Sequence, residues 1–216
     1  MKIKIFEFNP LAVNTYILSD ETNECVIIDA ACFFPDERKK LIQYIIDNQL
    51  VVKHLLNTHL HFDHIFGVNV VANQFNVGMQ CHQGDLFLLD DVPGQLRMFG
   101  IPTTFDFTPK VGALLNEKST IMFGNQMFRV LHIPGHSPGS LVFYNEKEKC
   151  VFVGDVLFKG SIGRTDLLGG SYEALIEGIQ TKLWALPSET VVYPGHGPAT
   201  TIEEEKIHNP FVGINI

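Results

Sequence analysis

Short runs in which apolar and polar residues alternate dominate the first thirty positions of the chain. Residues 2–8 and 14–18 carry this pattern, and residues 25–29 form a third run that is rich in β-branched side chains. A polar stretch over residues 20–24 separates the second run from the third. Runs of this kind, bounded by turn residues, predict three β-strands joined as an antiparallel meander.

From residue 35 onward, helical patterns alternate with strand-like runs. Residues 35–48 place apolar side chains at helical spacing and begin with a proline, as many helices do. A buried strand is predicted over residues 51–57, and a helix is predicted to end near Phe75. A strand over residues 77–82 and a short helix over 85–90 follow. This alternation of helices and strands indicates an α/β protein.

The second half of the chain repeats the order of the first, with hairpins followed by a helix and a strand. Gly124-Asn125 lies between two alternating runs, which is a hairpin signal. The predicted strands cover residues 118–123, 126–132, 140–144, 150–153 and 190–193, and the predicted helices cover 172–186 and 202–208. Two mixed β-sheets flanked by helices, a four-layer αββα sandwich of the α/β (α+β) class, would hold these elements in a single domain over residues 1–216.

Residues 92–110 fit neither pattern. They are rich in turn residues, yet they also carry apolar side chains such as Leu96, Met98 and Phe99. An ordinary long connection is the favoured interpretation. A flap over a binding site, or a contact between subunits of a homo-oligomer, are the alternatives, because long loops are often functional.

Charge and hydropathy narrow the choice of partners. The chain has 216 residues and a formal net charge of -8, whereas a nucleic-acid binder needs a basic face, so no nucleic-acid partner is expected. No apolar run is long enough to span a bilayer, so no membrane partner is expected either. Glu7 and Asn9 stand where a signal peptide would carry an apolar core, which favours a cytoplasmic protein.

The cysteines form no metal-binding or disulfide pattern. None belongs to a CxxC pair, and the four are Cys25, Cys32, Cys81 and Cys150. Buried free thiols in a reducing compartment are the favoured interpretation. Cys32, which follows Asp29-Ala30-Ala31 in a predicted loop, is the only candidate for reactivity.

The most distinctive stretch of the chain is residues 58–64, Thr-His-Leu-His-Phe-Asp-His, at the end of a predicted strand. His59 and His61 are two residues apart, so in an extended loop their side chains point the same way. Asp63 and His64 follow where the next helix is predicted to begin, and they are aimed differently. One loop can therefore serve two neighbouring metal ions. Imidazole with carboxylate suits zinc, iron or manganese.

Further candidate ligands stand directly after predicted strands. His136 and His196 each lie in a Pro-Gly-His loop, and Asp155 ends the strand that contains Phe152-Val153-Gly154. Asp29 also ends a strand. It is either a turn or cap residue, or a carboxylate that orients a metal-bound histidine.

With these residues in this order, the chain resembles the metallo-β-lactamase fold superfamily. The resemblance covers most of the chain and implies that fold. It implies one metal ion held by His59, His61 and His136, a second held by Asp63, His64 and His196, and Asp155 bridging both. Two such ions leave room for a bridging hydroxide that attacks a carbonyl carbon, with Asp63 and Asp155 holding or accepting a proton. Zinc is the first expectation for both ions, with iron or manganese as alternatives.

The segment from Gly154 to Asp166, with the His196 loop, looks like the glyoxalase II group, which hydrolyses thioesters such as S-lactoylglutathione. This implies a small-molecule thioester substrate. Arg164 falls where that group binds the glutathione carboxylate, although an ion pair with Asp166 or Glu173 is an equal alternative. Asp166 stands where the group has a tyrosine, and the C-terminal helical domain that binds glutathione is missing. Both departures bear on whether glutathione is part of the substrate, and the second is shared by the short glyoxalase II-like branch, to which the chain is expected to belong.

The alternative function is that of a persulfide dioxygenase, a class that shares the Gly163–Asp166 segment. Such enzymes use a single iron, which His59, His136 and Asp155 would hold here, and they act on glutathione persulfide. A β-lactamase is disfavoured because the periplasmic ones need an export signal. In their principal subclass a cysteine also replaces the residue equivalent to Asp155.

Overall fold

The computed structural model describes residues 1–101 and 109–214. Its first six-stranded sheet runs β1-β2-β3-β4-β5-β6, with an antiparallel half, β1 to β3, and a parallel half, β3 to β6. The strands are β1 (Lys2–Phe8), β2 (Val13–Ser19), β3 (Glu24–Ile28), β4 (Val51–Leu56), β5 (Met79–His82) and β6 (Val111–Leu115). The sheet is mixed because the meander at its start gives way to helical crossovers.

The second sheet runs β14-β13-β10-β9-β8-β7. Its only parallel pair among the described residues is β10 with β13, and the other neighbours are antiparallel. The strands are β7 (Thr120–Phe123), β8 (Gln126–His132), β9 (Leu141–Asn145), β10 (Cys150–Gly154), β13 (Val191–Pro194) and β14 (Thr200–Thr201). A small ribbon of β11 (Leu157–Phe158) and β12 (Ser161–Ile162) follows β10.

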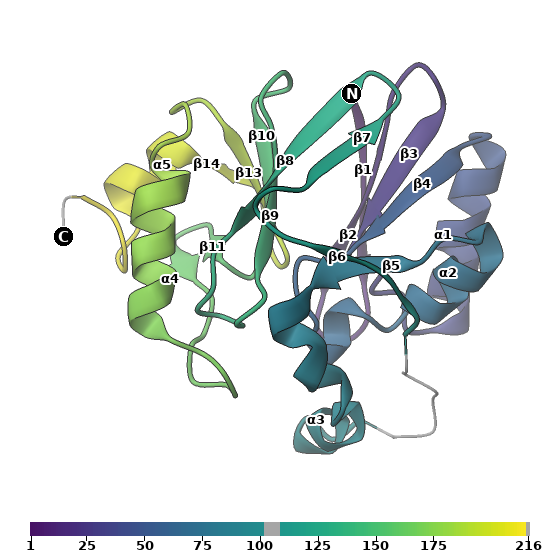
Figure 1. The fold of residues 1–216 in the computed structure, drawn as a ribbon, viewed down its shortest axis with the longest axis horizontal. Coiled ribbons are helices and arrows are strands. Elements are labelled where there is room, and N and C mark those ends of the chain that lie inside the picture. The colour runs from purple at the N-terminus through teal and green to yellow at the C-terminus, as the bar shows by residue number, and fades with distance from the viewer. Residues whose placement is uncertain (102–108, 215–216) are drawn as a thin grey trace.

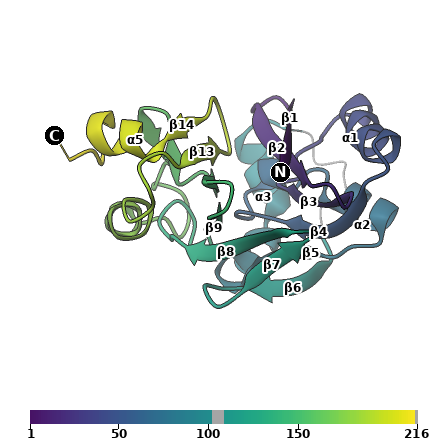
Figure 2. The ribbon, with the colours of Figure 1, turned by 90° about the horizontal axis from the view of Figure 1, so that it is seen from above.

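Helices lie on the outer face of each sheet. Figures 1 and 2 show α1 (Pro35–Asp47) and α2 (Val68–Phe75) beside the first sheet, and α4 (Tyr172–Gly178) and α5 (Ile202–His208) beside the second. A π-helical segment, Ile179–Leu183, extends α4. Two 3₁₀ turns, Phe62–His64 and Gln83–Leu89, and the helix α3 (Val92–Met98) complete the set. No helix in the described part of the chain is long and apolar enough to cross a membrane.

The buried side chains form three layers, and this explains the sandwich. In β2, Ile17 packs into the cluster under α1 and α2, while its neighbours Tyr16 and Leu18 point to the cluster between the sheets. Phe128 and Phe152 enter that middle cluster from the second sheet. A third cluster lies between the second sheet and α4. Because both faces of each sheet are covered, the predicted αββα architecture is confirmed.

The structure also corrects several details of the prediction. The metal motif does not lead straight into a helix: its residues 62–64 form a 3₁₀ turn, and α2 begins only at Val68, after Gly67. The favoured reading of residues 92–110 as a connection is wrong at its start, where α3 forms, while residues 102–108 lie outside the described residues. The strands β6, β11, β12 and β14 were not predicted, because they are short or lack a clear alternating pattern.

Cys32 is not the reactive thiol that its predicted loop position suggested. Its side chain is fully buried, and burial raises the pKa of the thiol to about 12. All four cysteines are buried and free, as the sequence predicted. Since the thiolate is the reactive form, Cys32 is inert at neutral pH.

Candidate metal centre

Five loops that follow strand ends meet at one place between the two sheets. The loop after β3 carries Asp29, and the loop after β4 carries the 59–64 motif. In the second sheet, the loops after β8, β10 and β13 carry His136, Asp155 and His196. The carboxyl ends of strands are where α/β folds place their ligand sites. The sequence-predicted candidates are therefore brought together, although they span more than 160 positions of the chain.

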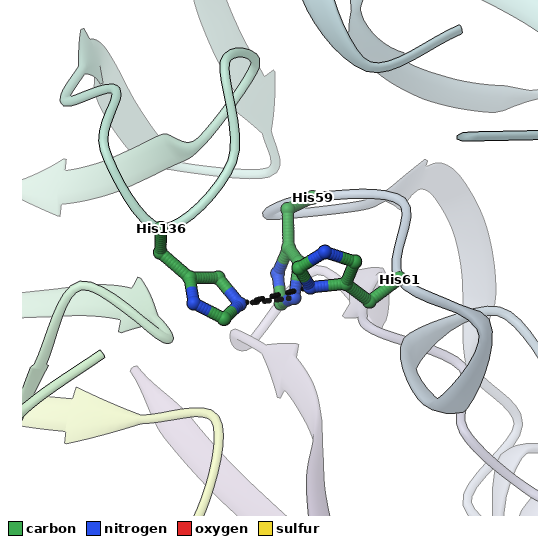
Figure 3. A group of neighbouring side chains, drawn as sticks. All are labelled: His59, His61 and His136. Atoms are coloured by element: carbon green, nitrogen blue, oxygen red, sulfur yellow. Dashed lines mark hydrogen bonds between the residues drawn. The ribbon is translucent and has the colours of Figure 1, made fainter. Parts of the chain in front are cut away.

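Three imidazoles form the first group. His61 Nδ1 lies 2.9 Å from His136 Nε2, and His136 Nε2 lies 3.3 Å from His59 Nε2 (Figure 3). Ligands roughly 2.0–2.1 Å from a tetrahedral zinc ion stand about 3.3 Å apart, so these nitrogen atoms have the spacing of a ligand set. Burial, followed by the neighbouring imidazoles, lowers the pKa of His61 to about 3 and that of His59 well below its ordinary value. Both rings are therefore neutral, as metal ligands must be.

Asp63, His64 and His196 form a second group. Asp63 Oδ2 lies 3.5 Å from His196 Nε2 and 3.8 Å from His64 Nε2. Burial acts to lower the pKa of His196, but its contacts with Asp155 and Asp63 outweigh this and raise the pKa to about 9. The second group thus combines one carboxylate with two imidazoles, whereas the first consists of imidazoles alone.

Asp155 lies between the two groups. Its Oδ1 is 3.4 Å from His64 Nε2, and its Oδ2 is 3.6 Å from His136 Nε2 and 3.5 Å from His196 Nε2. Among the described residues, His64 Nε2 and Asp155 Oδ1 are buried without any hydrogen-bond partner. Buried polar atoms in native proteins nearly always have a partner, so these two fit ligands of a cation. The residues present therefore fit metal binding.

Asp29 holds two of the candidate ligands through one carboxylate. Its Oδ2 accepts hydrogen bonds from His64 Nδ1 at 3.0 Å and from Thr58 Oγ1 at 2.7 Å. Because the Thr58 hydroxyl donates to Asp29, it accepts at 3.0 Å from His59 Nδ1. With Nδ1 protonated in both rings, Nε2 is left to face the centre. These contacts favour the orienting role of Asp29 over that of a turn residue.

Backbone carbonyl groups orient the other two rings in the same way. His136 Nδ1 donates to the Arg164 carbonyl oxygen at 2.9 Å, and His196 Nδ1 donates to the Leu11 carbonyl oxygen at 2.9 Å. A carbonyl oxygen only accepts, so Nδ1 carries a proton in each ring and Nε2 is the nitrogen that faces the centre. His61 is the exception, since its Nδ1 faces the centre.

The first sheet holds the loop of the second sheet that carries His196. Asn14 Nδ2 donates to the carbonyl oxygens of Pro194 and Gly197, at 3.1 and 2.8 Å. The Tyr16 hydroxyl also donates to the Pro194 carbonyl oxygen, at 2.6 Å. Sequence reasoning missed both residues, because each looks like an ordinary position in an alternating strand.

Asp85 is a further residue that sequence reasoning missed. It is fully buried at the start of the second 3₁₀ turn. Its Oδ2 accepts from Leu60 N at 3.1 Å and from Ser137 Oγ at 2.8 Å, and its Oδ1 accepts from Gly139 N. The carboxylate therefore ties the loop of His59 and His61 to the loop of His136. No local pattern marks it, since it reads as the first polar residue of a short helix.

The Asp85→Asn variant is expected to bind metal about 10–100-fold more weakly, the usual effect of losing a group that orients ligands. The asparagine amide would place an NH₂ group beside Leu60 N, Ser137 Oγ and Gly139 N, which donate to the Asp85 carboxylate. The loop of His59 and His61 would then separate from the loop of His136. Competition with a chelator measures the affinity. The exposed Asp90→Asn serves as the control, and an Asp85→Asn affinity equal to that of the control would show that this carboxylate does not position the loops.

Gly195 leaves room for Asp155. A Cβ atom at this position would lie 2.2 Å from Asp155 Oδ1 and 2.8 Å from His64 Cε1. We expect Gly195→Ala to lower kcat/KM for the protein's substrate about 100-fold, because displacing reacting groups by about 1 Å has that effect. Gly197→Ala is the control, since its Cβ meets nothing within 4 Å and only its positive φ of 74° is strained. An equal decrease of kcat/KM in Gly195→Ala and Gly197→Ala would refute the steric argument.

Arg164 forms one of the two interactions that the sequence suggested for it. Its side chain forms a bidentate ion pair with Asp166, with Nε–Oδ1 at 2.7 Å and Nη2–Oδ2 at 2.8 Å. This pair lowers the pKa of Asp166 to about 2. Arg164 also lines the cavity next to the centre. The predicted ion pair with Asp166 is therefore formed, and a carboxylate ligand would have to compete with it.

The remaining histidines within strands have other partners. His54 contacts the Gln80 side chain and the Met122 carbonyl oxygen, and the rings of His82 and His132 stack 4.1 Å apart. None of these belongs to the groups of candidate metal ligands found among the described residues.

Known proteins resemble this chain in sequence and fold. The pattern of the Metallo-beta-lactamase superfamily matches residues 8–196, up to the last candidate ligand. Hydroxyacylglutathione hydrolase GloC of Haemophilus influenzae is 37% identical over 214 residues, which cover 98% of each chain. The crystal structure of BLEG-1 B3 metallo-beta-lactamase has a TM-score of 0.89 and 38% identity over 98% of this chain and 99% of its own. TTHA1623 in a di-iron-bound form has a TM-score of 0.85 and 36% identity over 96% and 99%. The chain belongs to the metallo-beta-lactamase superfamily.

Proposed function

We propose that the protein is a metal-dependent hydrolase that cleaves a small-molecule thioester, S-lactoylglutathione or a related compound. The observation that carries this proposal is that two buried atoms without a hydrogen bond, His64 Nε2 and Asp155 Oδ1, lie 3.4 Å apart between two groups of candidate ligands. The relative from Haemophilus influenzae is described as a hydroxyacylglutathione hydrolase, which supports the same chemistry here.

Two divalent ions suit the centre better than one. The proposed ligands exceed the three protein ligands that a single catalytic zinc ion usually takes. The first ion would be held by His59, His61 and His136, the second by Asp63, His64 and His196, and both by Asp155. Zinc is the first choice for both positions. Iron and manganese remain alternatives, and TTHA1623 is a relative described with two iron ions.

Bound ions of this kind would supply a hydroxide near neutral pH and polarise the scissile carbonyl group. The protein's own contribution is to hold and orient the groups around them. Asp29 and two backbone carbonyl groups fix which nitrogen of His64, His136 and His196 faces the centre. Although burial acts to raise the pKa of Asp155, the nearby imidazoles, His64 above all, hold it well below its ordinary value. Asp155 and Asp63 are thus ionised at neutral pH, as carboxylate ligands of a metal ion must be.

The side chains around the centre support attack by solvent. The hydroxyl groups of Ser137 and Ser140 are engaged with Asp85 and with each other. Burial raises the pKa of every cysteine thiol to about 12, so none is a thiolate at neutral pH. A covalent nucleophile on the protein is therefore not part of the proposal.

The test combines metal analysis with three assays on the same purified protein. We expect two metal equivalents per chain and hydrolysis of S-lactoylglutathione that disappears on dialysis against a chelator and returns with zinc. One iron equivalent, with oxygen consumed on glutathione persulfide and no hydrolysis, would establish the dioxygenase instead. A penicillin serves as the third substrate, because BLEG-1 is described as a B3 metallo-beta-lactamase. Cleavage of the β-lactam alone would overturn the thioesterase assignment.

A further inference from the structure

A cavity of about 410 Å³ opens beside the metal centre, and its wall away from the centre is largely apolar. Five of the proposed metal ligands form one end of it: His61, Asp63, His136, Asp155 and His196. The apolar wall includes Phe62, which belongs to the metal motif, and Leu11, whose carbonyl oxygen orients His196. A group bound in the cavity would therefore be in contact with the reacting centre.

Exposed apolar side chains gather at this cavity. Met98 and Leu168 are each 75% exposed, Phe99 is 43% exposed and Phe87 is 36% exposed, and all four line the cavity. They come from three separate segments of the chain: the second 3₁₀ turn, the end of α3 and the loop after β12. Single exposed apolar residues are ordinary, but a group of them around one cavity marks a binding surface.

The charged groups on the cavity wall beyond the centre are already engaged. Among the described residues these are Asp91 and Arg164. Asp91 Oδ1 accepts from Gly94 N at 2.9 Å and caps α3, and Arg164 is paired with Asp166. The amide of Gln95 donates to the Leu88 carbonyl oxygen at 2.7 Å. The cavity thus offers a bound group apolar surface and no unpaired charge.

A second cavity also adjoins the centre. It is lined by Lys159 and Ser161 and shares His136, Asp155, Arg164 and His196 with the first. A thioester has two arms that extend from its carbonyl group. With the carbonyl group at the centre, one arm would enter each cavity.

From these observations we infer that the apolar cavity binds an uncharged hydrocarbon arm, so that the preferred substrates are thioesters with one apolar arm. This inference rests on the proposed thioesterase function and specifies its substrate class. A fully polar substrate such as S-lactoylglutathione would leave the exposed side chains of Met98 and Leu168 in water. A hydrocarbon chain would cover them.

The test uses the metal-loaded protein and two series of neutral thioesters. In one, the acyl chain on N-acetylcysteamine grows from two to eight carbons, and in the other an alkyl thiol grows while the acyl group stays acetyl. In one of the two series we expect kcat/KM to rise about fourfold per added methylene, the factor that corresponds to about 0.8 kcal/mol of burial. Flat responses in both series, with S-lactoylglutathione cleaved well, would overturn the inference while leaving the thioesterase intact.

Variants test the location of the arm. The double variant Met98→Gln with Leu168→Asn keeps side-chain size similar and makes the cavity polar, and we expect it to remove most of the chain-length dependence. Met122→Gln is the matched control, because Met122 is 63% exposed on β7 and does not line the cavity. The same loss in the control, or no loss in the double variant, would contradict the assignment.

Calorimetric binding of a thioether, which has no cleavable carbonyl group, separates this inference from the proposed function. S-octyl-N-acetylcysteamine is expected to bind the metal-loaded wild-type protein more tightly than its S-ethyl analogue, and to lose that advantage in the double variant. This result would support the apolar cavity even if no thioester were hydrolysed. Equal binding of the two thioethers would refute it whatever the hydrolysis assays gave.

Discussion

The Asp63→Ala variant is expected to hydrolyse S-lactoylglutathione at least about 10²–10⁴-fold more slowly than the wild-type protein, the range that loss of a positioned proton acceptor covers. Asp63 is the only carboxylate that belongs to the second ligand group alone, beside His64 and His196. Without it two imidazoles and the shared Asp155 remain, so that the proposed second ion is lost. Metal analysis is therefore expected to fall from two equivalents to one.

The variant should keep its fold, which makes the kinetic result interpretable. The main chain at this position is held independently, because Asn9 Nδ2 donates to the Asp63 carbonyl oxygen at 3.0 Å. Circular dichroism and thermal unfolding check this point. The conservative Asp63→Asn provides the comparison, since it retains volume and loses only the charge. Undiminished hydrolysis with one metal equivalent would show that the two-ion proposal is wrong.

The second large effect is expected for Asp29→Ala. This substitution leaves the Thr58 amide, the Thr58 hydroxyl and His64 Nδ1 without their shared acceptor, and all three are buried. Removing one partner of a buried charged network typically lowers the free energy of unfolding by about 3–5 kcal/mol. We expect a loss of this size in urea unfolding, together with loss of bound metal.

Thr58→Val separates the two consequences of removing Asp29. It replaces the hydroxyl that links Asp29 to His59, while the Asp29 contact with His64 Nδ1 remains. We expect a smaller decrease in stability, about 1–3 kcal/mol for the unsatisfied groups, and weaker metal binding at the first group only. If Asp29→Ala unfolded no more easily than Thr58→Val, the carboxylate would not be the centre of this network.

The sequence was most informative where function depends on local spacing. The alternation of His59, Leu60 and His61, and the Pro-Gly-His loops after two strands, are visible in a few consecutive letters. The apolar patterns predicted the sandwich for the same reason, because each strand or helix shows its buried face within one segment. The structure places the predicted ligands within 4.8 Å of one another in three groups.

What the sequence could not show are contacts between distant segments. Asp85 meets Ser137 across 52 positions, and Asn14 meets Pro194 across 180. No period within a strand or turn signals such partners. The end of the motif was also mispredicted, because the 3₁₀ turn at Phe62–His64 depends on packing around it and not on helix propensity. The same holds for α3, whose proline and glycine read as turn residues.

The hydrogen bonds from Asn14 to the loop that carries His196 have a consequence for the order of events during synthesis. They join positions about 180 residues apart, and closing so long a loop is entropically costly and comes late. In the two-ion proposal, His196 can therefore join the second ion only after the ribosome has released residues 1–197. A nascent chain that already contains His59, His61 and His136 can recruit the first ion earlier. We expect translation to be followed by stepwise metal acquisition, with the first position filled before the second.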